Sequence, residues 1–171
     1  MARLTVLHFP DPRLRKLAAP IKSVDESIRQ LARDMLETMY EEGGIGLAAT
    51  QVNIQKRLVV IDLSAEKNTP MFLINPEIIT ADGRETMQEG CLSVPGFYET
   101  VERAETITCR YLTLEGEVRE EQADDLLAVC IQHEIDHLDG KLFIDYLSPL
   151  KQQRLRKKIE KHEKFEATPS L

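Results

Sequence analysis

Apolar residues recur at helical spacing near the start of the chain. Their three- and four-residue intervals place the side chains on one face of a helix, where methionines fill a core readily. These residues are Ile28, Leu31, Met35 and Met39. Ser23 precedes Glu26 by the spacing of a capping box, and Gly43-Gly44 follows the last apolar position. The pattern therefore predicts an N-terminal helix that begins near Ser23 and ends at the two glycines.

The middle of the chain consists of short apolar or β-branched runs separated by turn residues, a pattern typical of strands. We expect strands at 57–63, 71–75, 78–80, 85–87, 100–103 and 106–114, and a polar edge strand at 117–121. Asp82-Gly83 predicts a hairpin between the third and fourth runs, and Pro95-Gly96 predicts a break in regular pairing. Because the connections are too short for repeated crossover helices, the pairing should be antiparallel or mixed.

Two further helices are expected in the C-terminal third. Asp124-Asp125 places acidic side chains at the positive end of one helix, which should end at Asp139-Gly140. Ser148-Pro149 is a suitable cap and first residue for the other, which should run from 150 to about 165. The pattern predicts an α+β fold in which mixed, mainly antiparallel sheets pack around a central helix, with an N-terminal helix and a C-terminal helix in addition.

Length and composition fit a single domain over 1–171. The 171 residues are 42% hydrophobic and 30% charged, and no apolar run approaches the roughly 20 residues that span a bilayer. No signal-like segment opens the chain, so a cytoplasmic location is the default expectation. The net charge of −7 argues against nucleic-acid binding by the whole surface, but residues 149–171, a basic helix and tail, carry a local balance of +4.

The candidate chemistry centres on a His-Glu-x-x-His pattern at 133–137. On a helix, His133 and His137 lie one turn apart on the same face and can share a metal ion. Glu134 then lies beside that ion and can take a proton from a metal-bound water, which indicates hydrolysis. A charged surface helix with two incidental histidines is the alternative. Apolar side chains on the histidine face would form a wall beside the ion, and these are Leu126, Val129 and Cys130.

Catalytic metal sites of this kind usually have a third protein ligand. Downstream of the histidines the candidates are His162, Asp145 and Glu160, and none of them has a supporting motif. Cys91 lies in a constrained Gly-Cys loop, and thiolates bind borderline divalent ions strongly. A buried, inert thiol is the alternative for Cys91 and the expectation for Cys109 and Cys130. An odd number of cysteines argues against a disulfide framework.

Three segments together resemble the peptide deformylases, and they occur in that family's order and at its usual spacing. These segments are 44–51, 89–93 and 132–137. The chain is most similar to bacterial iron-type members with a long C-terminal helix. The resemblance implies removal of the N-formyl group from the initiator methionine of nascent polypeptides, with release of formate. Gly96-Phe97-Tyr98 departs from members that place an arginine near position 98, at the rim of the substrate groove.

The resemblance also implies a role for each residue of the site. The metal ligands would be Cys91, His133 and His137, with Fe(II) as the physiological ion and zinc, nickel or cobalt possible in a preparation. Glu134 would carry the proton, while the side chain of Gln51 and the backbone N–H of Leu92 would stabilise the oxyanion. The residues that would bind the substrate are Ile45, Gly46, Met87, Glu89, Gly90, Leu126, Val129 and Cys130. Glu89 would also form a supporting ion pair with Arg103.

Two other functions stay open from the residues alone. A general zinc endopeptidase commonly has a third His or Glu ligand downstream, and a non-catalytic module with a structural metal usually has four protein ligands. The second possibility would leave Glu134 and Gln51 unexplained. The helix at 149–171 is either solvated or, as the resemblance suggests, a ribosome-docking element. No membrane partner is expected, and the protein is expected to be a monomer.

Overall fold

The computed structural model describes residues 3–166, with side chains from residue 3 to residue 161. Within this part of the chain lie three α-helices, seven strands and three short 3₁₀ helices. The α-helices are α1 (Glu26–Glu41), α2 (Asp125–Leu138) and α3 (Pro149–Glu166). The strands are β1 (Gly46–Ala48), β2 (Leu58–Ile61), β3 (Met71–Asp82), β4 (Glu85–Cys91), β5 (Val94–Arg103), β6 (Thr106–Leu112) and β7 (Val118–Asp124). The 3₁₀ helices are η1 (Pro12–Arg15), η2 (Ala49–Val52) and η3 (Phe143–Tyr146).

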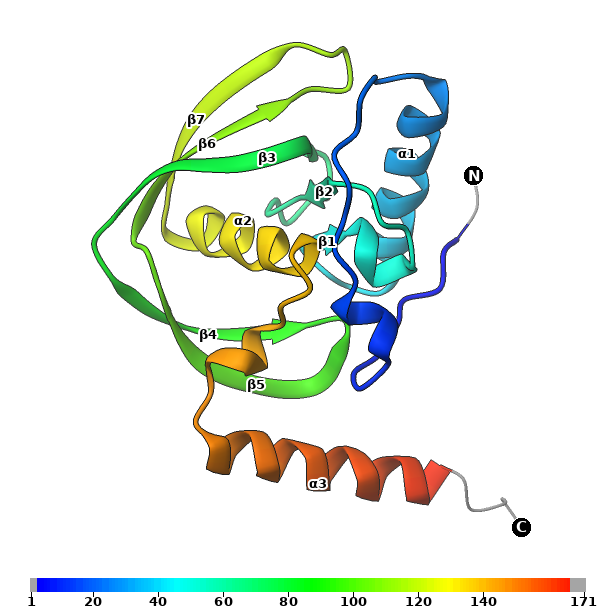
Figure 1. Cartoon of the computed structure of the whole chain (residues 1–171), viewed down its shortest axis with the longest axis vertical. Helices are drawn as coiled ribbons and strands as arrows, with labels where there is room; N and C mark the ends of the chain where they lie inside the picture. Colours follow the sequence, from blue (N-terminus) through cyan, green and yellow to red (C-terminus); the bar gives the residue numbers. More distant parts are fainter. Residues whose placement is uncertain (1–2, 167–171) are drawn as a thin grey trace.

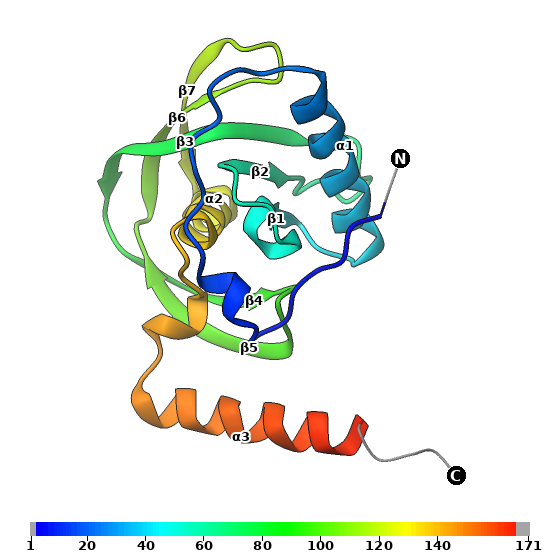
Figure 2. The same ribbon diagram turned by 45° about the vertical axis from the view of Figure 1, so that its right-hand side comes forward.

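The strands form two antiparallel sheets with α2 between them (Figures 1 and 2). Strand order is β1-β2-β3-β6-β7 in the larger sheet, and β4 pairs with β5 in the smaller one. Within each of these two sheets every pair of neighbouring strands is antiparallel, as the short connections require. The expected α+β fold, with mainly antiparallel sheets around a central helix, is confirmed.

Strand β2 separates two apolar cores, because its side chains alternate between the two faces of the sheet. Val59 and Ile61 pack in the core that includes α2, whereas Leu58 and Val60 pack in the core that includes the apolar stripe of α1. All four residues are buried. Each such side chain stabilises the fold by roughly 1.5–3 kcal/mol when fully buried. A strand covered on both faces explains why this run is continuously apolar rather than alternating.

The chain from β3 to β6 is one long bent ribbon, which Figure 1 shows curving from the larger sheet to the smaller. Asp82 pairs with Thr106 and Glu85 pairs with Arg103, so Gly83 lies at a bend within the ribbon. The predicted hairpin at Asp82-Gly83 is therefore wrong. Gly83 does adopt a positive φ of 70°, but the strand after it pairs with β5 instead of folding back on β3. The tip of the ribbon is the turn between Cys91 and Val94.

The predicted break in regular pairing at Pro95-Gly96 is present as a local irregularity. Cys91 pairs with Val94 and Glu89 pairs with Glu99, so the register shifts across the part of β5 that contains both residues, and regular pairing resumes at Glu99.

The prediction that Ser23 caps α1 is wrong. The N-cap of α1 is Asp25, whose carboxylate accepts a hydrogen bond from the backbone N–H of Ile28 at 3.0 Å. Asp25 stands closer to the first apolar position than Ser23 does, and aspartate is an equally good cap.

Helix α3 lies alongside the smaller sheet and is amphipathic despite its many basic residues (Figure 1). Leu155 is buried in a third apolar cluster with Val101 of β5 and Phe143 of η3, and Ile159 packs against the same cluster. The lysine and arginine side chains between these positions face outward. Ser148 caps the helix by accepting a hydrogen bond from the backbone N–H of Lys151 at 3.3 Å, as predicted. None of the helices in residues 3–166 has the length and apolar character of a membrane span.

Candidate metal centre

Three potential ligand atoms converge where the ribbon tip meets α2. Cys91 Sγ lies 3.3 Å from His137 Nε2, which lies 3.2 Å from His133 Nε2. The three donor atoms all lie within 4.8 Å of one another, and both imidazoles are buried. One sulfur and two imidazole nitrogens are the donors that borderline divalent ions bind well. The donor set and its convergence therefore fit a metal ion, and they bring together the three ligands expected from the sequence.

The ring of His133 and the backbone of His137 are held by contacts outside this cluster. Glu89 Oε1 lies 2.9 Å from His133 Nδ1, which leaves Nε2 of that ring directed at the other two donors. Phe143 stacks on the His133 ring with the centroids 5.9 Å apart. The backbone at His137 is fixed because Thr50 donates a hydrogen bond from Oγ1 to the carbonyl oxygen of His137 at 2.9 Å. Such outer contacts orient metal-binding imidazoles and raise their basicity.

Glu89 itself belongs to a buried charge network. Arg103 donates to its carboxylate from Nε at 2.6 Å and from Nη2 at 2.9 Å, and a third nitrogen of Arg103 reaches Asp136 at 2.9 Å. Tyr146 donates to the same Asp136 oxygen at 2.7 Å. Burial alone would raise the pKa of Glu89, but hydrogen bonds from His133 and Arg103 hold that pKa below its ordinary value. The expected ion pair with Arg103 is present, and the carboxylate of Glu89 is occupied by protein partners rather than free for a substrate.

Glu134 lies beside the cluster with an unused acceptor. Its side chain is 4% exposed, and its Oε1 atom has no hydrogen-bond partner among the described residues. Burial raises the pKa of Glu134 to about 7, against the opposing charges of His133 and Arg103. A Cβ atom at Gly46 would collide with Oε2 of Glu134 and lie 3.1 Å from its Cδ, so only glycine at position 46 lets the carboxylate approach β1. A buried carboxyl group with a raised pKa is suited to accepting and returning a proton.

The side-chain amide of Gln51, in η2, is oriented by the end of β1 and by the ribbon tip. Its Oε1 accepts a hydrogen bond from the backbone N–H of Ala48 at 2.9 Å, so its NH₂ group must face the other way. That nitrogen donates to Ser93 Oγ at 3.0 Å and lies 3.6 Å from Cys91 Sγ. The N-terminal segment braces both elements, because Leu7 N–H donates to the Gln51 carbonyl and Phe9 N–H to the Ser93 carbonyl, each at 2.7 Å.

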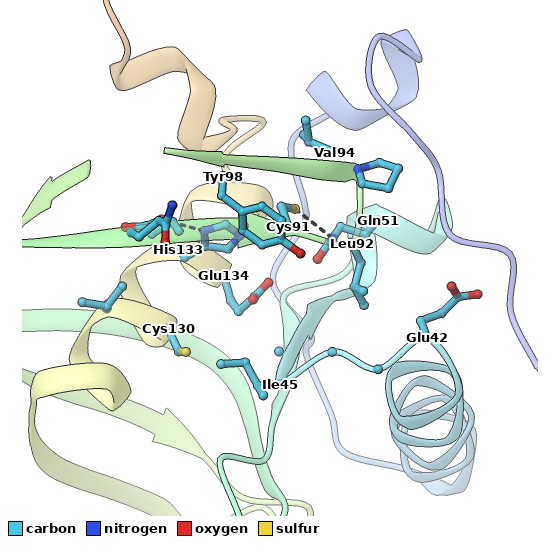
Figure 3. A pocket seen from close by; sticks show the side chains of 18 of the residues that line it. Glu42, Ile45, Gln51, Cys91, Leu92, Val94, Tyr98, Cys130, His133 and Glu134 are labelled. Atoms are coloured by element: carbon cyan, nitrogen blue, oxygen red, sulfur yellow. Dashed lines mark hydrogen bonds and ion pairs between the residues drawn. The ribbon is translucent and has the colours of Figure 1, made fainter. Parts of the chain in front are cut away.

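A cavity of about 510 Å³ opens beside the cluster (Figure 3). All eight residues expected to bind substrate line it: Ile45, Gly46, Met87, Glu89, Gly90, Leu126, Val129 and Cys130. Ile45 and Leu126 are 43% and 41% exposed, so they lie at the mouth, whereas Val129 and Cys130 are buried. Burial raises the pKa of Cys130 to about 12, which keeps its thiol neutral. The side chain of Leu92 also lines the cavity and leaves no room for a Cβ atom at Gly44, which would lie 2.6 Å from Leu92 Cδ1.

Several contacts of the site are not among the sequence predictions. Ser93, Phe143 and Tyr146 have no predicted role, although Ser93 belongs to the same short segment as Cys91 and could have been found there. Tyr98 lines the cavity, in agreement with the groove-rim position that the resemblance implies. The rejected ligand candidate Asp145 pairs with Arg15, with 2.6 Å between Nη1 and Oδ2. The side chain of His162 lies outside the described residues.

The sequence is similar to proteins of a single family. A family model described as polypeptide deformylase matches residues 3–153. The peptide deformylase of Pseudoalteromonas translucida is 62% identical over 165 residues, which cover 96% of this chain and 99% of that protein. A second relative, the peptide deformylase of Pseudomonas aeruginosa, is 58% identical over 169 residues, which cover 98% of this chain and 100% of that protein.

Solved structures give the same result. A crystal structure of a peptide deformylase from Legionella pneumophila superposes with a TM-score of 0.93 at 46% identity, covering 99% of this chain and 100% of that one. The peptide deformylase from Ehrlichia chaffeensis in complex with actinonin superposes with a TM-score of 0.90 at 39% identity, covering 95% of this chain and 99% of that one. These similarities extend over both sheets, α2 and the residues of the cluster.

Proposed function

The chain belongs to the peptide deformylase family, and we propose that Cys91, His133 and His137 hold its metal ion. Members of this family are metal-dependent hydrolases, and this chain is one that removes the N-formyl group from nascent peptides. The observation that supports this ligand set is the convergence of the three donor atoms within 4.8 Å. We propose Fe(II) as the physiological ion, with zinc, nickel or cobalt as possible substitutes, because these ions accept the same donors.

The bound ion would act as a Lewis acid that polarises the formyl carbonyl and activates the attacking water. Glu134 takes the proton from that water as its oxygen attacks the formyl carbon. When the bond between that carbon and the methionine nitrogen breaks, Glu134 returns the proton to the leaving amine, and formate is released. The buried carboxylate oxygen of Glu134 that lacks a partner supports this assignment, because it is an acceptor held ready beside the donor cluster.

Two donors of this chain would stabilise the charge that develops on the former carbonyl oxygen. Gln51 supplies its side-chain NH₂ group, which the hydrogen bond from Ala48 turns toward the ribbon tip. Leu92 supplies its backbone N–H, next to the ligand Cys91. Donors that are oriented before the reaction need no rearrangement in the transition state, and removing one typically costs roughly 10²–10³ in rate.

The apolar cavity is suited to the side chain of the formylated methionine. Val129 and the neutral Cys130 form its buried wall, while Ile45, Leu126 and Met87 complete its lining. An unbranched thioether fills an irregular apolar pocket well. The peptide backbone would pass between β1 and β4, where Gly46 and Gly90 present main-chain groups without side chains in the way. Glu89 acts through His133 and Arg103 rather than by touching the substrate.

The ligand count favours hydrolysis over a structural role for the metal. Structural sites are normally closed by four protein ligands, whereas the cluster formed by residues with described side chains has three members. Three ligands leave a position open for water or substrate. A general endopeptidase would need a cleft that accepts chain on both sides of the cut bond, and no observation at this pocket favours one.

Helix α3 supports a proposal about where the enzyme works. Its apolar residues Leu155 and Ile159 face the body, which leaves Arg154, Lys157 and Lys161 on the exposed side. Phosphate backbones attract such a basic surface in a salt-dependent manner. We therefore propose that residues 149–171 dock on the ribosome. We further propose that the protein works in the cytoplasm as a monomer, and that residues 1–171 act as one catalytic domain. Salt-dependent co-sedimentation with ribosomes should disappear when the chain is truncated after Tyr146.

A single assay tests the proposed function. Protein purified without oxygen should carry about one divalent ion per chain and release formate from a formyl-methionyl peptide. The same sample should leave the acetyl-methionyl peptide and internal peptide bonds intact. Metal-loaded protein that is inert on formyl-methionyl peptides would contradict the function, whereas activity without any bound metal would contradict the proposed centre.

A further inference from the structure

Tyr146, the last residue of η3, contacts the surroundings of the metal centre from outside, and no step of the proposed reaction uses it. Although 51% of its surface is exposed, its hydroxyl donates a hydrogen bond to Asp136 Oδ2 at 2.7 Å. Asp136 lies on α2 between His133 and His137 in the chain. Burial and the bond to Asp136 raise the pKa of Tyr146 to about 12, so the hydroxyl keeps its proton and remains a donor.

A series of polar contacts connects this hydroxyl to a proposed metal ligand. The Asp136 oxygen that accepts from Tyr146 also accepts from Arg103 Nη1 at 2.9 Å. The other face of the guanidinium holds Glu89, with 2.6 Å from Nε and 2.9 Å from Nη2. Glu89 Oε1 in turn lies 2.9 Å from His133 Nδ1. Because Arg103 is shared between two carboxylates, a shift of one carboxylate changes how it holds the other.

The ring of Tyr146 covers the middle of this series. The guanidinium carbon of Arg103 lies over the ring, 5.1 Å from its centroid. Only 4% of the Arg103 side chain and 16% of the Asp136 side chain are exposed. A ring in this position attracts the cation and keeps water from it, and ion pairs are stronger where water is excluded. The hydroxyl and the ring of Tyr146 therefore act on two different members of the network.

Helix η3 is fixed in place, so Tyr146 is presented from a rigid support. Arg15 of η1 donates to the carboxylate of Asp145 from Nη1 at 2.6 Å and from Nη2 at 2.9 Å. At the other end of η3, Phe143 stacks on the His133 ring with the centroids 5.9 Å apart. Figure 1 shows this orange turn next to β4 and β5, between α2 and α3. One short element thus contacts the metal centre twice, once at the imidazole ring and once at the far end of its hydrogen-bond network.

We propose that Tyr146 is a positioning residue for His133, acting through the two carboxylates and the guanidinium that lie between them. Its hydroxyl fixes the Asp136 carboxylate on one side of Arg103, which keeps the guanidinium aligned with Glu89 on the other. Partners of this kind set the direction and basicity of a metal-binding imidazole. This inference rests on the proposed function, because it takes the three-donor cluster as the metal site.

The test measures cobalt(II) binding by the wild-type protein, Tyr146→Phe and Tyr146→Ala. Tyr146→Phe keeps the ring over Arg103 and loses the hydroxyl. Its affinity for cobalt(II), from competition with a chelator of known affinity, should fall by roughly three- to tenfold, the size of one hydrogen bond. Tyr146→Ala loses both contacts, so its affinity should fall further, and the conservative phenylalanine should restore part of it. The visible absorption of bound cobalt(II), which reports the ligand geometry, should change in the same order.

Tyr111→Phe is the matched control. The hydroxyl of Tyr111 also donates to a carboxylate, that of Glu121 at 2.8 Å, but this pair belongs to the larger sheet instead of the network around Arg103. The control should lose stability to urea, as expected for a lost hydrogen bond, and bind cobalt(II) as the wild-type protein does.

Three results would overturn the inference. Both Tyr146 variants could keep the wild-type affinity, both could keep the wild-type absorption spectrum, or Tyr111→Phe could weaken cobalt(II) binding as much as Tyr146→Phe does. The last result would mean that a general loss of stability causes the effect. A wild-type protein that binds no cobalt(II) would overturn the proposed metal centre instead.

Discussion

Glu89 Oε1 lies 2.9 Å from His133 Nδ1, although the two residues are 44 positions apart in the chain. The contact joins β4 to α2 and fixes one imidazole of the donor cluster through its outer nitrogen. Arg103 holds the same carboxylate with two hydrogen bonds, so the acceptor cannot rotate away. The orientation of this proposed metal ligand is therefore set by an ion pair on the neighbouring sheet.

Replacing this acceptor should weaken metal binding. Glu89→Gln removes the charge that favours a proton on His133 Nδ1 and disturbs the pair with Arg103, so metal affinity should fall by roughly 10–100-fold. Competition with a chelator of known affinity measures the change. Glu102→Gln, on the exposed face of the same ribbon, is the control and should bind the metal as the wild-type protein does. If Glu89→Gln binds the metal as tightly as Glu102→Gln does, Glu89 has no orienting role.

The close approach of Gly46 to Glu134 predicts a variant that retains metal but loses activity. Gly46→Ala places a methyl group where the Glu134 carboxylate lies, so the carboxylate must move. A displacement of this kind can cost about 10² in rate. We expect kcat/KM on a formyl-methionyl peptide to fall at least that far while the metal content stays the same. Glu134→Ala should show the same pattern more strongly. Full activity in Gly46→Ala would mean that the position of this carboxylate does not matter.

The cysteines should differ in their effect on the metal. Cys91→Ala removes one of three donors, so the protein should lose most of its metal during dialysis. Cys109→Ala is the matched control, because Cys109 is buried in the larger sheet away from the cluster, and burial raises the pKa of its thiol to about 11. That variant should keep its metal and lose only stability. Normal metal content in Cys91→Ala, measured by elemental analysis, would show that the ligand set is wrong.

Asp62 should make the fold sensitive to acid. Its carboxylate accepts hydrogen bonds from Ser64 N at 2.9 Å, Ser64 Oγ at 2.6 Å and Thr69 N at 3.2 Å, and it also accepts one from the hydroxyl of Tyr40. Burial opposes ionisation, but these donors lower the pKa of Asp62 from 3.8 to about 2. Because the folded-state pKa is the lower one, this stabilisation is present above the unfolded pKa and disappears as the pH falls toward 2.

The measurement is urea unfolding of the wild-type protein and Asp62→Asn at about pH 6 and about pH 3. Between the two values the wild-type protein should lose more unfolding free energy than the variant, which has no carboxylate to protonate at this position. Parallel losses in both proteins would show that Asp62 does not contribute to the acid sensitivity.

Contacts set by local spacing could be predicted from the sequence, and contacts between distant segments could not. The histidine pair follows from one turn of helix, and the apolar stripe of α1 follows from the same period. Cys91 joins them in the prediction through its thiolate chemistry and its constrained Gly-Cys loop, and the three segments taken together agree with that choice. The contact of Glu89 with His133 depends on how two sheets enclose α2, which no local pattern encodes. The close approach of the Tyr98 ring to the backbone of Gly90 likewise depends on how the two strands of the ribbon tip meet.

The wrong predictions have physical causes of the same kind. Asp82-Gly83 carries a genuine turn signal, and Gly83 does take a positive φ, but a turn residue does not determine which strand the chain pairs with next. Ser23 and Asp25 are both acceptable helix caps, and the chain uses the one nearer the first buried position. Pro95, by contrast, lies where the register between β4 and β5 shifts, as the missing backbone N–H of proline favours.

The ribbon from β3 to β6 carries Cys91 at its tip, 46 positions before His137 in the chain. Before this ribbon folds over α2, Cys91 is far from the helix. At that stage the chain can offer a metal ion only His133 and His137. The full metal affinity, which needs all three donors, would therefore be reached only at the end of folding. Once bound, the ion would link the ribbon tip to α2 as a covalent cross-link does. The enzyme would thus become competent only after the contact between the ribbon tip and α2 has closed.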